Sequence, residues 1–283
     1  MKKIFKILLV LSLIGCLALT ISLFTGCKIN YEQNFTLITE NYENIYIDVD
    51  TADITFLFGD KTSVSLYEHK KDKHTVKVEN DTLIIQNEGL NRILFSSGVN
   101  IKITLDKKEY KDLNIKNSTG DVNFYSQFTF DNILIEQSTG DVTITSNVLN
   151  KLSVEVSTGD IELRNLTANE VVAISTTGDI DLSEVNVNTL NISADTGEVS
   201  LTATMVQNKA TIKTDTGDVD FVRSDFGELE VETDTGDVEG TILSSKIFIV
   251  YTDTGRKRVP ETTTGGVAKI TTDTGDIIIT IVQ

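Results

Sequence analysis

Apolar and polar residues alternate along most of the chain with a spacing of two, the periodicity of β-strands that bury one face. From residue 113 onward this alternation comes in short segments on either side of a Thr-Gly dipeptide. The dipeptide glycines recur every 19 or 20 residues, at Gly120, Gly140, Gly159, Gly178, Gly197, Gly217, Gly236, Gly255 and Gly275. So strict a period predicts an array of stacked, nearly identical units.

The positions around each glycine repeat as strictly as the glycine itself. Two residues after it an apolar residue follows in every unit except one, where Lys257 stands. Five residues before it the chain has Ile115, Ile135, Val154, Ala173, Ile192, Ile212, Val231, Val250 and Ile270. Units this short cannot close a core alone, so each coil should lie on the next with parallel strands in register. The sequence predicts an all-β fold, a single-stranded β-solenoid (β-helix) of 19–20-residue coils over residues 113–283.

Residues 28–112 alternate in the same way but without the period, and we expect them to form an N-terminal β cap. Asp50-Thr51-Ala52-Asp53 resembles a degenerate copy of the repeated corner, with Ala52 in the place of glycine. Ser97-Gly98 is a second candidate for such a corner. These two segments predict that the cap and the array are continuous.

The repeated glycine is expected where the chain turns a corner, because a positive φ and the lack of a Cβ favour glycine there. An acidic residue follows it in every unit except one, where Arg256 stands. The acidic residues are Asp121, Asp141, Asp160, Asp179, Glu198, Asp218, Asp237 and Asp276. We interpret their carboxylates as caps for the turned backbone N–H groups.

The first 27 residues have a different character. Lys2, Lys3 and Lys6 precede an apolar run from Ile7 to Phe24, which is long enough to cross a bilayer as one helix. Three ways of holding the chain stay open: an uncleaved single-span helix, lipidation at Cys27 within a lipobox-like Phe24-Thr25-Gly26-Cys27, or release of a signal peptide. All three place residues 28–283 outside the cytoplasm, and the first two predict a protein of the cell membrane.

Charge and cysteine content exclude several classes of function. The formal net charge is −17, and beyond residue 27 the chain carries 25 − 3 = 22 basic against 42 acidic side chains, a net −20. A nucleic-acid partner is therefore excluded, because phosphate binding needs a surplus of Lys and Arg. No cysteine follows Cys27, so the external domain has no disulfide and no thiolate site.

Together, the basic start and apolar run, the opening strand Ile45-Tyr46-Ile47-Asp48-Val49 and the recurring Ser/Asp-Thr-Gly-Asp-Val/Ile resemble the bacterial DUF4097 family. This family of β-strand-repeat proteins is also described as candidate adhesins. The resemblance covers about residues 30–283 and implies a β-solenoid at the cell surface, in some relatives linked to envelope stress. It implies no reaction and no catalytic residues. Lys257 departs from the apolar residue that the pattern expects.

Two acidic columns in the second half of the array are candidates for a ligand or cation surface. They consist of Asp195, Asp215, Asp234, Asp253 and Asp273, two residues before the glycine, and Asp218, Asp237 and Asp276, directly after it. Calcium would suit such oxygen ligands. The alternative is turn capping along a solvated acidic edge, and the sequence assigns no metal site and no cofactor.

Arg256, Lys257 and Arg258 form a basic cluster within the acidic array, either a contact for an anionic glycan or protein or a guard against edge pairing. We expect His69 and His74 to lie at a solvated hairpin tip.

The uniform spacing leaves no insertion that could wall a catalytic cleft, so we expect no enzyme. The sequence thus favours an adhesin-like interaction module of the cell envelope, with an envelope glycan or protein as partner. The alternative is a calcium-dependent or glycan-active, polysaccharide-processing surface protein.

Overall fold

The computed structural model describes residues 31–282, apart from residue 71 and residues 89–97, and every regular element in this part is a β-strand. Among these residues no helix has the length and hydropathy that a membrane span requires. The segment expected to reach the membrane, residues 1–27, lies outside the described residues.

The described residues form twenty-two strands, which follow one another along the chain. The N-terminal ones are β1 (Tyr31–Leu37), β2 (Asn44–Thr51), β3 (Asp53–Phe58), β4 (Ser63–His69), β5 (His74–Glu79), β6 (Thr82–Asn87) and β7 (Asn100–Leu105). The repeats hold β8 (Glu109–Thr119), β9 (Val122–Phe124), β10 (Thr129–Thr139), β11 (Val142–Ile144), β12 (Asn147–Thr158), β13 (Ile161–Thr177), β14 (Ile180–Thr196), β15 (Val199–Thr202), β16 (Met205–Thr216) and β17 (Val219–Thr235). The last are β18 (Val238–Ile242), β19 (Lys246–Thr254), β20 (Lys257–Arg258), β21 (Gly266–Thr274) and β22 (Ile277–Ile281).

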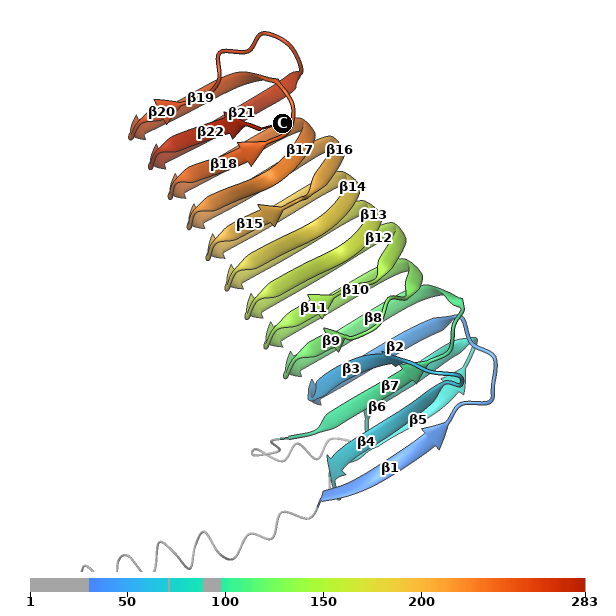
Figure 1. The fold of residues 1–283 in the computed structure, drawn as a ribbon. Coiled ribbons are helices and arrows are strands. Elements are labelled where there is room, and N and C mark those ends of the chain that lie inside the picture. The colour runs from blue at the N-terminus through green and yellow to red at the C-terminus, as the bar shows by residue number, and fades with distance from the viewer. Residues whose placement is uncertain (1–30, 71, 89–97, 283) are drawn as a thin grey trace, which may run out of the picture.

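From β8 to β17 the coils stack in chain order through parallel ladders, which confirms the predicted solenoid (Figure 1). Ile135 pairs with Ile115 of the preceding coil and with Val154 of the following one, so equivalent positions lie directly above one another. All three side chains are buried. The columns read from the sequence are therefore the continuous core of the solenoid.

The glycine corner has the two properties expected of it. Gly178 has a φ of +139°, and a Cβ added there would clash with the carbonyl oxygen of Gly159 in the preceding coil. Gly120 rests in the same way on the carbonyl of Ala52, which confirms the corner at Ala52 as a degenerate copy. At both glycines the corner stacks too closely on the preceding coil for any side chain.

A second corner, six residues after the glycine, has no glycine to reveal it. Asn165, Glu184, Ala203 and Arg223 occupy this position in four successive coils, with φ between +48° and +56°. This left-handed conformation costs a residue with a side chain about 1–2 kcal/mol. The stacking of neighbouring coils imposes it.

Coil order departs from chain order at both ends of the stack (Figure 1). Near the N-terminus, β2 and β3 lie between β8 and β9 on one side and β6 and β7 on the other. Near the C-terminus, β21 and β22 lie between β17 and β18 on one side and β19 and β20 on the other. At the C-terminal end the chain first forms the outermost coil, β19 and β20, and then the coil beneath it, β21 and β22. Its apolar last strand, β22, therefore lies inside the sheet.

Antiparallel strands lie at the N-terminal end. β1 pairs with β4, β4 with β7, and β5 with β6, all antiparallel. The unphased sequence before residue 113 thus contributes two coils to the stack and adds antiparallel strands beside them.

Candidate functional site

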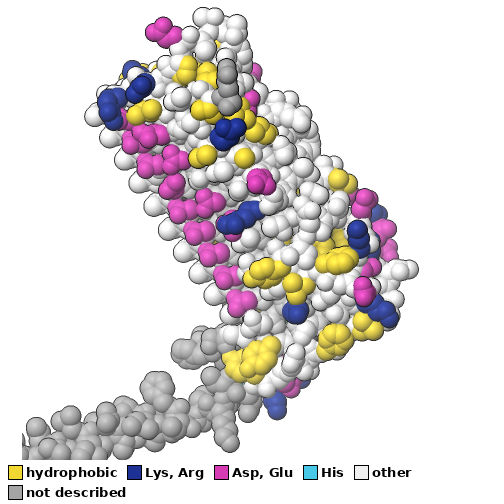
Figure 2. All heavy atoms as spheres, viewed as in Figure 1, with side chains coloured by type: hydrophobic (Ala, Val, Ile, Leu, Met, Phe, Trp, Pro, Cys, Tyr) yellow, Lys and Arg dark blue, Asp and Glu magenta, His cyan; other side chains and the backbone are white. Residues whose placement is uncertain are grey.

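Carboxylates at the glycine corner form a ladder that runs from coil to coil. The backbone N–H of Asp160 donates to Oδ1 of Asp141 at 2.9 Å, and the N–H of Asp179 donates to Oδ1 of Asp160 at 2.8 Å. The same link joins Asp237 to Asp218 at 2.8 Å. Acidic side chains accordingly form a row along one side of the stack in Figure 2. The predicted capping role is confirmed, but each carboxylate caps the N–H of a neighbouring coil.

The two acidic columns therefore differ in what they do. Asp218, Asp237 and Asp276 are used as caps, whereas the outer column is exposed along its whole length; its members are Asp195, Asp215, Asp234, Asp253 and Asp273. In the described part of the chain, no three acidic or histidine side chains are arranged to hold a metal ion. The described residues therefore provide no set of ligands for the calcium ion that the alternative function requires.

The ladder is interrupted after Glu198. Its own N–H donates to Oδ1 of Asp179 at 2.8 Å, but among the described residues no carboxylate accepts from the N–H of Asp218. The Glu198 side chain instead lies near the carboxyl group of Asp220. Burial raises the pKa of Glu198, and the neighbouring Asp220 carboxyl group raises it further. Because its side chain is longer, Glu198 does not cap the N–H of Asp218. It instead brings two carboxyl groups together, which repel each other when both are ionised.

The predicted basic cluster divides into different roles. Arg256 is paired with Asp276 through both its backbone and its guanidinium. The ammonium of Lys257 lies 5.7 Å from the ring centre of Tyr251, and Arg258 is exposed. Within this cluster, Lys257 and Arg258 therefore offer a positive charge to a partner without giving up an ion pair seen in the described residues.

The outermost coil, β19 and β20, presents apolar side chains to solvent. The outward residues of β19 are Ile247, Ile249 and Tyr251, and Ile249 is 56 % exposed. At the equivalent positions β17 carries Glu228, Glu230 and Glu232. β19 pairs with β21 on one edge and with no described strand on the other. This coil combines an open strand edge, apolar side chains and a basic end.

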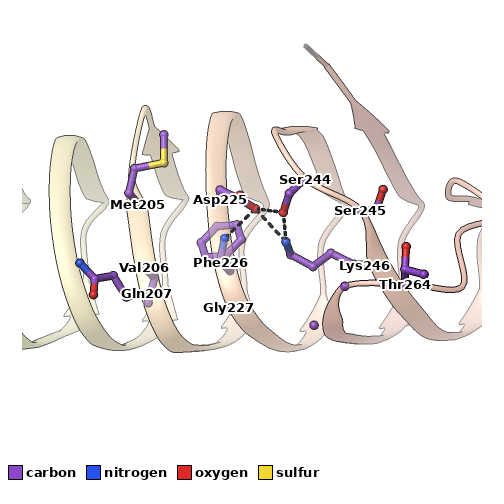
Figure 3. Close-up of a pocket in the computed structure, with 12 residues that line it drawn as sticks. Met205, Val206, Gln207, Asp225, Phe226, Gly227, Ser244, Ser245, Lys246 and Thr264 are labelled. Carbon is purple, nitrogen blue, oxygen red and sulfur yellow. Dashed lines mark hydrogen bonds and ion pairs between the residues drawn. The ribbon is translucent and has the colours of Figure 1, made fainter.

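Beside this coil lies a groove of about 560 Å³ with an ion pair at its base (Figure 3). Nζ of Lys246 lies 2.8 Å from Oδ1 of Asp225, to which Ser244 Oγ also donates at 2.7 Å. The Phe226 N–H donates to the same oxygen at 2.9 Å. Burial would raise the pKa of Asp225, but these hydrogen bonds outweigh it and lower the pKa.

Sequence reasoning missed Lys246, which is only 2 % exposed. It pairs with Gly266 of β21, and its side chain turns inward although the residue it pairs with has no side chain. Because its ladder partner is glycine, no column of apolar side chains in the sequence marks this position as inward. Because the ammonium is already paired with a carboxylate, the cluster has the form of a structural ion pair.

The two histidines do not form a solvated tip. His74 is 6 % exposed, and its Nδ1 and backbone N both lie 2.8 Å from Oε2 of the buried Glu68. His69 has its ring 5.9 Å from that of Tyr31. The expectation was wrong for His74 because antiparallel pairing of β5 with β6 turns this side chain inward.

Comparisons with known proteins place this geometry in context. A family model described as Toastrack DUF4097 matches residues 42–280. The solved structure of a candidate adhesin from Parabacteroides distasonis has a TM-score of 0.58 at 14 % identity and covers 89 % of this chain and 98 % of that chain. One from Parabacteroides merdae has a TM-score of 0.57 at 12 % identity, over 89 % and 97 %. At these identities the likeness shows the fold alone. No curated protein matches the chain.

Proposed function

The chain belongs to the Toastrack DUF4097 family, and on this premise we propose that it is a non-enzymatic interaction module of the bacterial cell envelope, with an adhesin-like role. The two structural neighbours described as candidate adhesins support this role. In this proposal the binding surface is the outside of the solenoid.

The observation that carries the proposal is the composition of the outermost coil. Ile247, Ile249 and Tyr251 are exposed on a strand whose free edge could pair with another chain. Lys257 and Arg258 follow at its end, on a chain that is otherwise acidic. Apolar contacts beside a few cations suit an anionic envelope glycan or protein.

In the same proposal residues 1–27 hold the protein at the cell membrane, as an uncleaved helix or through a lipidated Cys27. The solenoid is then extracytoplasmic, and the strands before residue 113 act as its cap. A link to envelope stress, which the family resemblance implies, belongs to the proposal as well.

The test compares binding of the full-length protein, reconstituted in vesicles, to isolated cell-wall material. We expect Ile249→Asp and Arg258→Glu to weaken co-sedimentation. Lys213→Glu serves as a matched control, because Lys213 is an exposed cation in the middle of the stack. Terminal-coil variants that bind as well as the control would contradict the proposed surface.

A further inference from the structure

A continuous outward face joins five strands at the N-terminal end of the molecule. β1 pairs with β4, β4 with β7, β7 with β3, and β3 with β9. Because side chains alternate along each strand, one residue in two points to this face. Its members are Gln33, Phe35 and Leu37 of β1, Ser63, Ser65 and Tyr67 of β4, Asn100, Lys102 and Thr104 of β7, Asp53, Thr55 and Leu57 of β3, and Asn123 with Tyr125 beyond β9. We call this surface the aromatic face.

Large apolar side chains lie exposed across the whole width of the aromatic face. Phe35 is 68 % exposed at one side and Tyr125 is 70 % exposed at the other, with Leu37 and Tyr67 also exposed. A shallow groove of about 330 Å³ runs beside Tyr125, Leu57 and Lys102. In Figure 2 hydrophobic side chains are likewise grouped over the N-terminal part of the molecule. A group of exposed large apolar side chains marks a surface that contacts a protein, a ligand or a membrane.

The aromatic face has almost none of the acidity of the rest of the chain. Beyond residue 27 the chain has 42 acidic side chains, yet the aromatic face has a single one, Asp53. The Asp53 carboxylate accepts the N–H of Asp121 at 3.1 Å, at the corner. Lys102 lies on the face, and the remaining members are uncharged. A surface without negative charge can approach anionic lipid headgroups.

The position of the aromatic face relative to the N-terminal segment indicates the partner. β1 begins at Tyr31, and the apolar run of the sequence ends at Phe24. Seven residue steps span at most about 25 Å even when fully extended. If residues 7–24 cross the bilayer, β1 and the face that it borders are held next to the headgroups.

We propose that the aromatic face docks on the lipid headgroup region of the membrane that holds the N-terminal segment. Phe and Leu would enter the interface, Tyr would keep its hydroxyl at the headgroups, and Lys102 would meet lipid phosphate. The inference rests on the membrane anchoring in the proposed function. It adds a second contact that fixes how the solenoid is oriented on the membrane.

The absence of tryptophan from the chain allows a direct test, because any introduced Trp is the single reporter. Full-length Phe35→Trp and Tyr125→Trp are reconstituted in vesicles of phosphatidylcholine and phosphatidylglycerol, with either ordinary or brominated acyl chains. Tyr251→Trp, on the outermost coil, is the matched control. We expect brominated lipid to quench the two reporters on the aromatic face and to leave the control unchanged.

Each other outcome overturns the proposal in a recognisable way. Reporters on the aromatic face that brominated lipid quenches no more than the control would show that the face does not touch lipid. A blue-shifted emission that is equal in both kinds of vesicle would show that protein covers the face, such as a second copy of the chain. Failure of the full-length protein to float with vesicles would refute membrane anchoring itself, and with it the docking.

Discussion

Arg256 and Asp276 are joined at two points although they lie 20 residues apart: the Arg256 N–H donates to Oδ1 of Asp276 at 2.7 Å, and Nε donates to Oδ2 at 2.8 Å. This pair ends the corner ladder on the outermost coil. No described coil lies beyond β19 and β20, so a carboxylate here would have no N–H to cap. An arginine instead balances the last carboxylate of the row.

Replacing Arg256 with Gln should raise the pKa of Asp276. The side-chain and backbone hydrogen bonds of Arg256 hold this pKa below its ordinary value of 3.8, and the variant keeps only the backbone one. An NMR titration of the Asp276 carboxyl group measures the change. Lys213→Gln removes a cation elsewhere in the stack and should leave the pKa of Asp276 unchanged. Equal titration curves for the wild type and Arg256→Gln would count against the pairing.

Glu198→Asp should stabilise the protein. The shorter side chain can accept the N–H of Asp218, as Asp179 accepts the N–H of Glu198, and it retreats from Asp220. One restored hydrogen bond is worth about 0.5–1.5 kcal/mol. Urea unfolding measures the gain. The reverse change one coil earlier, Asp179→Glu, is the control and should destabilise; a gain in both variants would refute the ladder account.

Glu230 should make the free energy of unfolding depend on pH in the acid range. Hydrogen bonds from Lys209 and Lys269 lower its pKa from 4.5 to about 2. A carboxyl group with a depressed folded-state pKa contributes stability above its unfolded pKa. That contribution is lost as the pH falls from about 4.5 to about 2. The free energy of unfolding, measured across this pH range, should fall less steeply for Glu230→Gln than for the wild type. Identical slopes would contradict the lowered pKa of Glu230.

The two corners of one coil should respond to substitution with opposite signs. Gly178→Ala forces a Cβ against the Gly159 carbonyl at a positive φ and should cost at least about 1–3 kcal/mol. Glu184→Gly removes the left-handed strain at the second corner, about 1–2 kcal/mol, against an entropic cost of about 0.5–1 kcal/mol. Thermal melts of both variants provide the measurement. A loss of stability in Glu184→Gly would show that its conformation is not strained.

Asp225→Ala should destabilise more than the double variant Asp225→Ala/Lys246→Met. The single change leaves the buried Lys246 ammonium without its carboxylate, which typically costs about 3–5 kcal/mol. The double change leaves no unpaired charge in the groove. Urea unfolding of both variants measures the order of stability. A double variant less stable than the single one would show that the unpaired Lys246 ammonium is not the cause of the destabilisation.

The sequence predicted those parts of the fold that depend on a fixed distance from the glycine. The buried column through Ile115 and Ile135, the corner at Gly178 and the capping by Asp160 all follow from that distance. The second corner at Glu184 was not predictable, because stacking imposes its positive φ on an ordinary residue. Lys246 was missed because its ladder partner is Gly266, so no column of apolar side chains marks its position as inward.

The reversed coil order at both ends was not predictable for a different reason. Any two coils present matching columns and can pair in register, so the periodicity does not determine which coil lies on which. The aromatic face was missed as well. Phe35, Tyr67 and Tyr125 are far apart in the sequence, and only the pairing of β1, β4, β7, β3 and β9 brings them onto one surface.

The return of the chain at each end has a mechanical consequence. A solenoid whose last coil is also its outermost one can be peeled from the terminus, one ladder at a time. Here the last strand, β22, is held between β18 and β20, so pulling it out of the sheet must break two ladders together. At the other end β1 pairs with β4 alone, but the first coil behind it is held in the same way, with β2 between β6 and β8. A protein loaded between a membrane and a distant partner could release β1 under tension, but the coils behind it would resist as a locked stack.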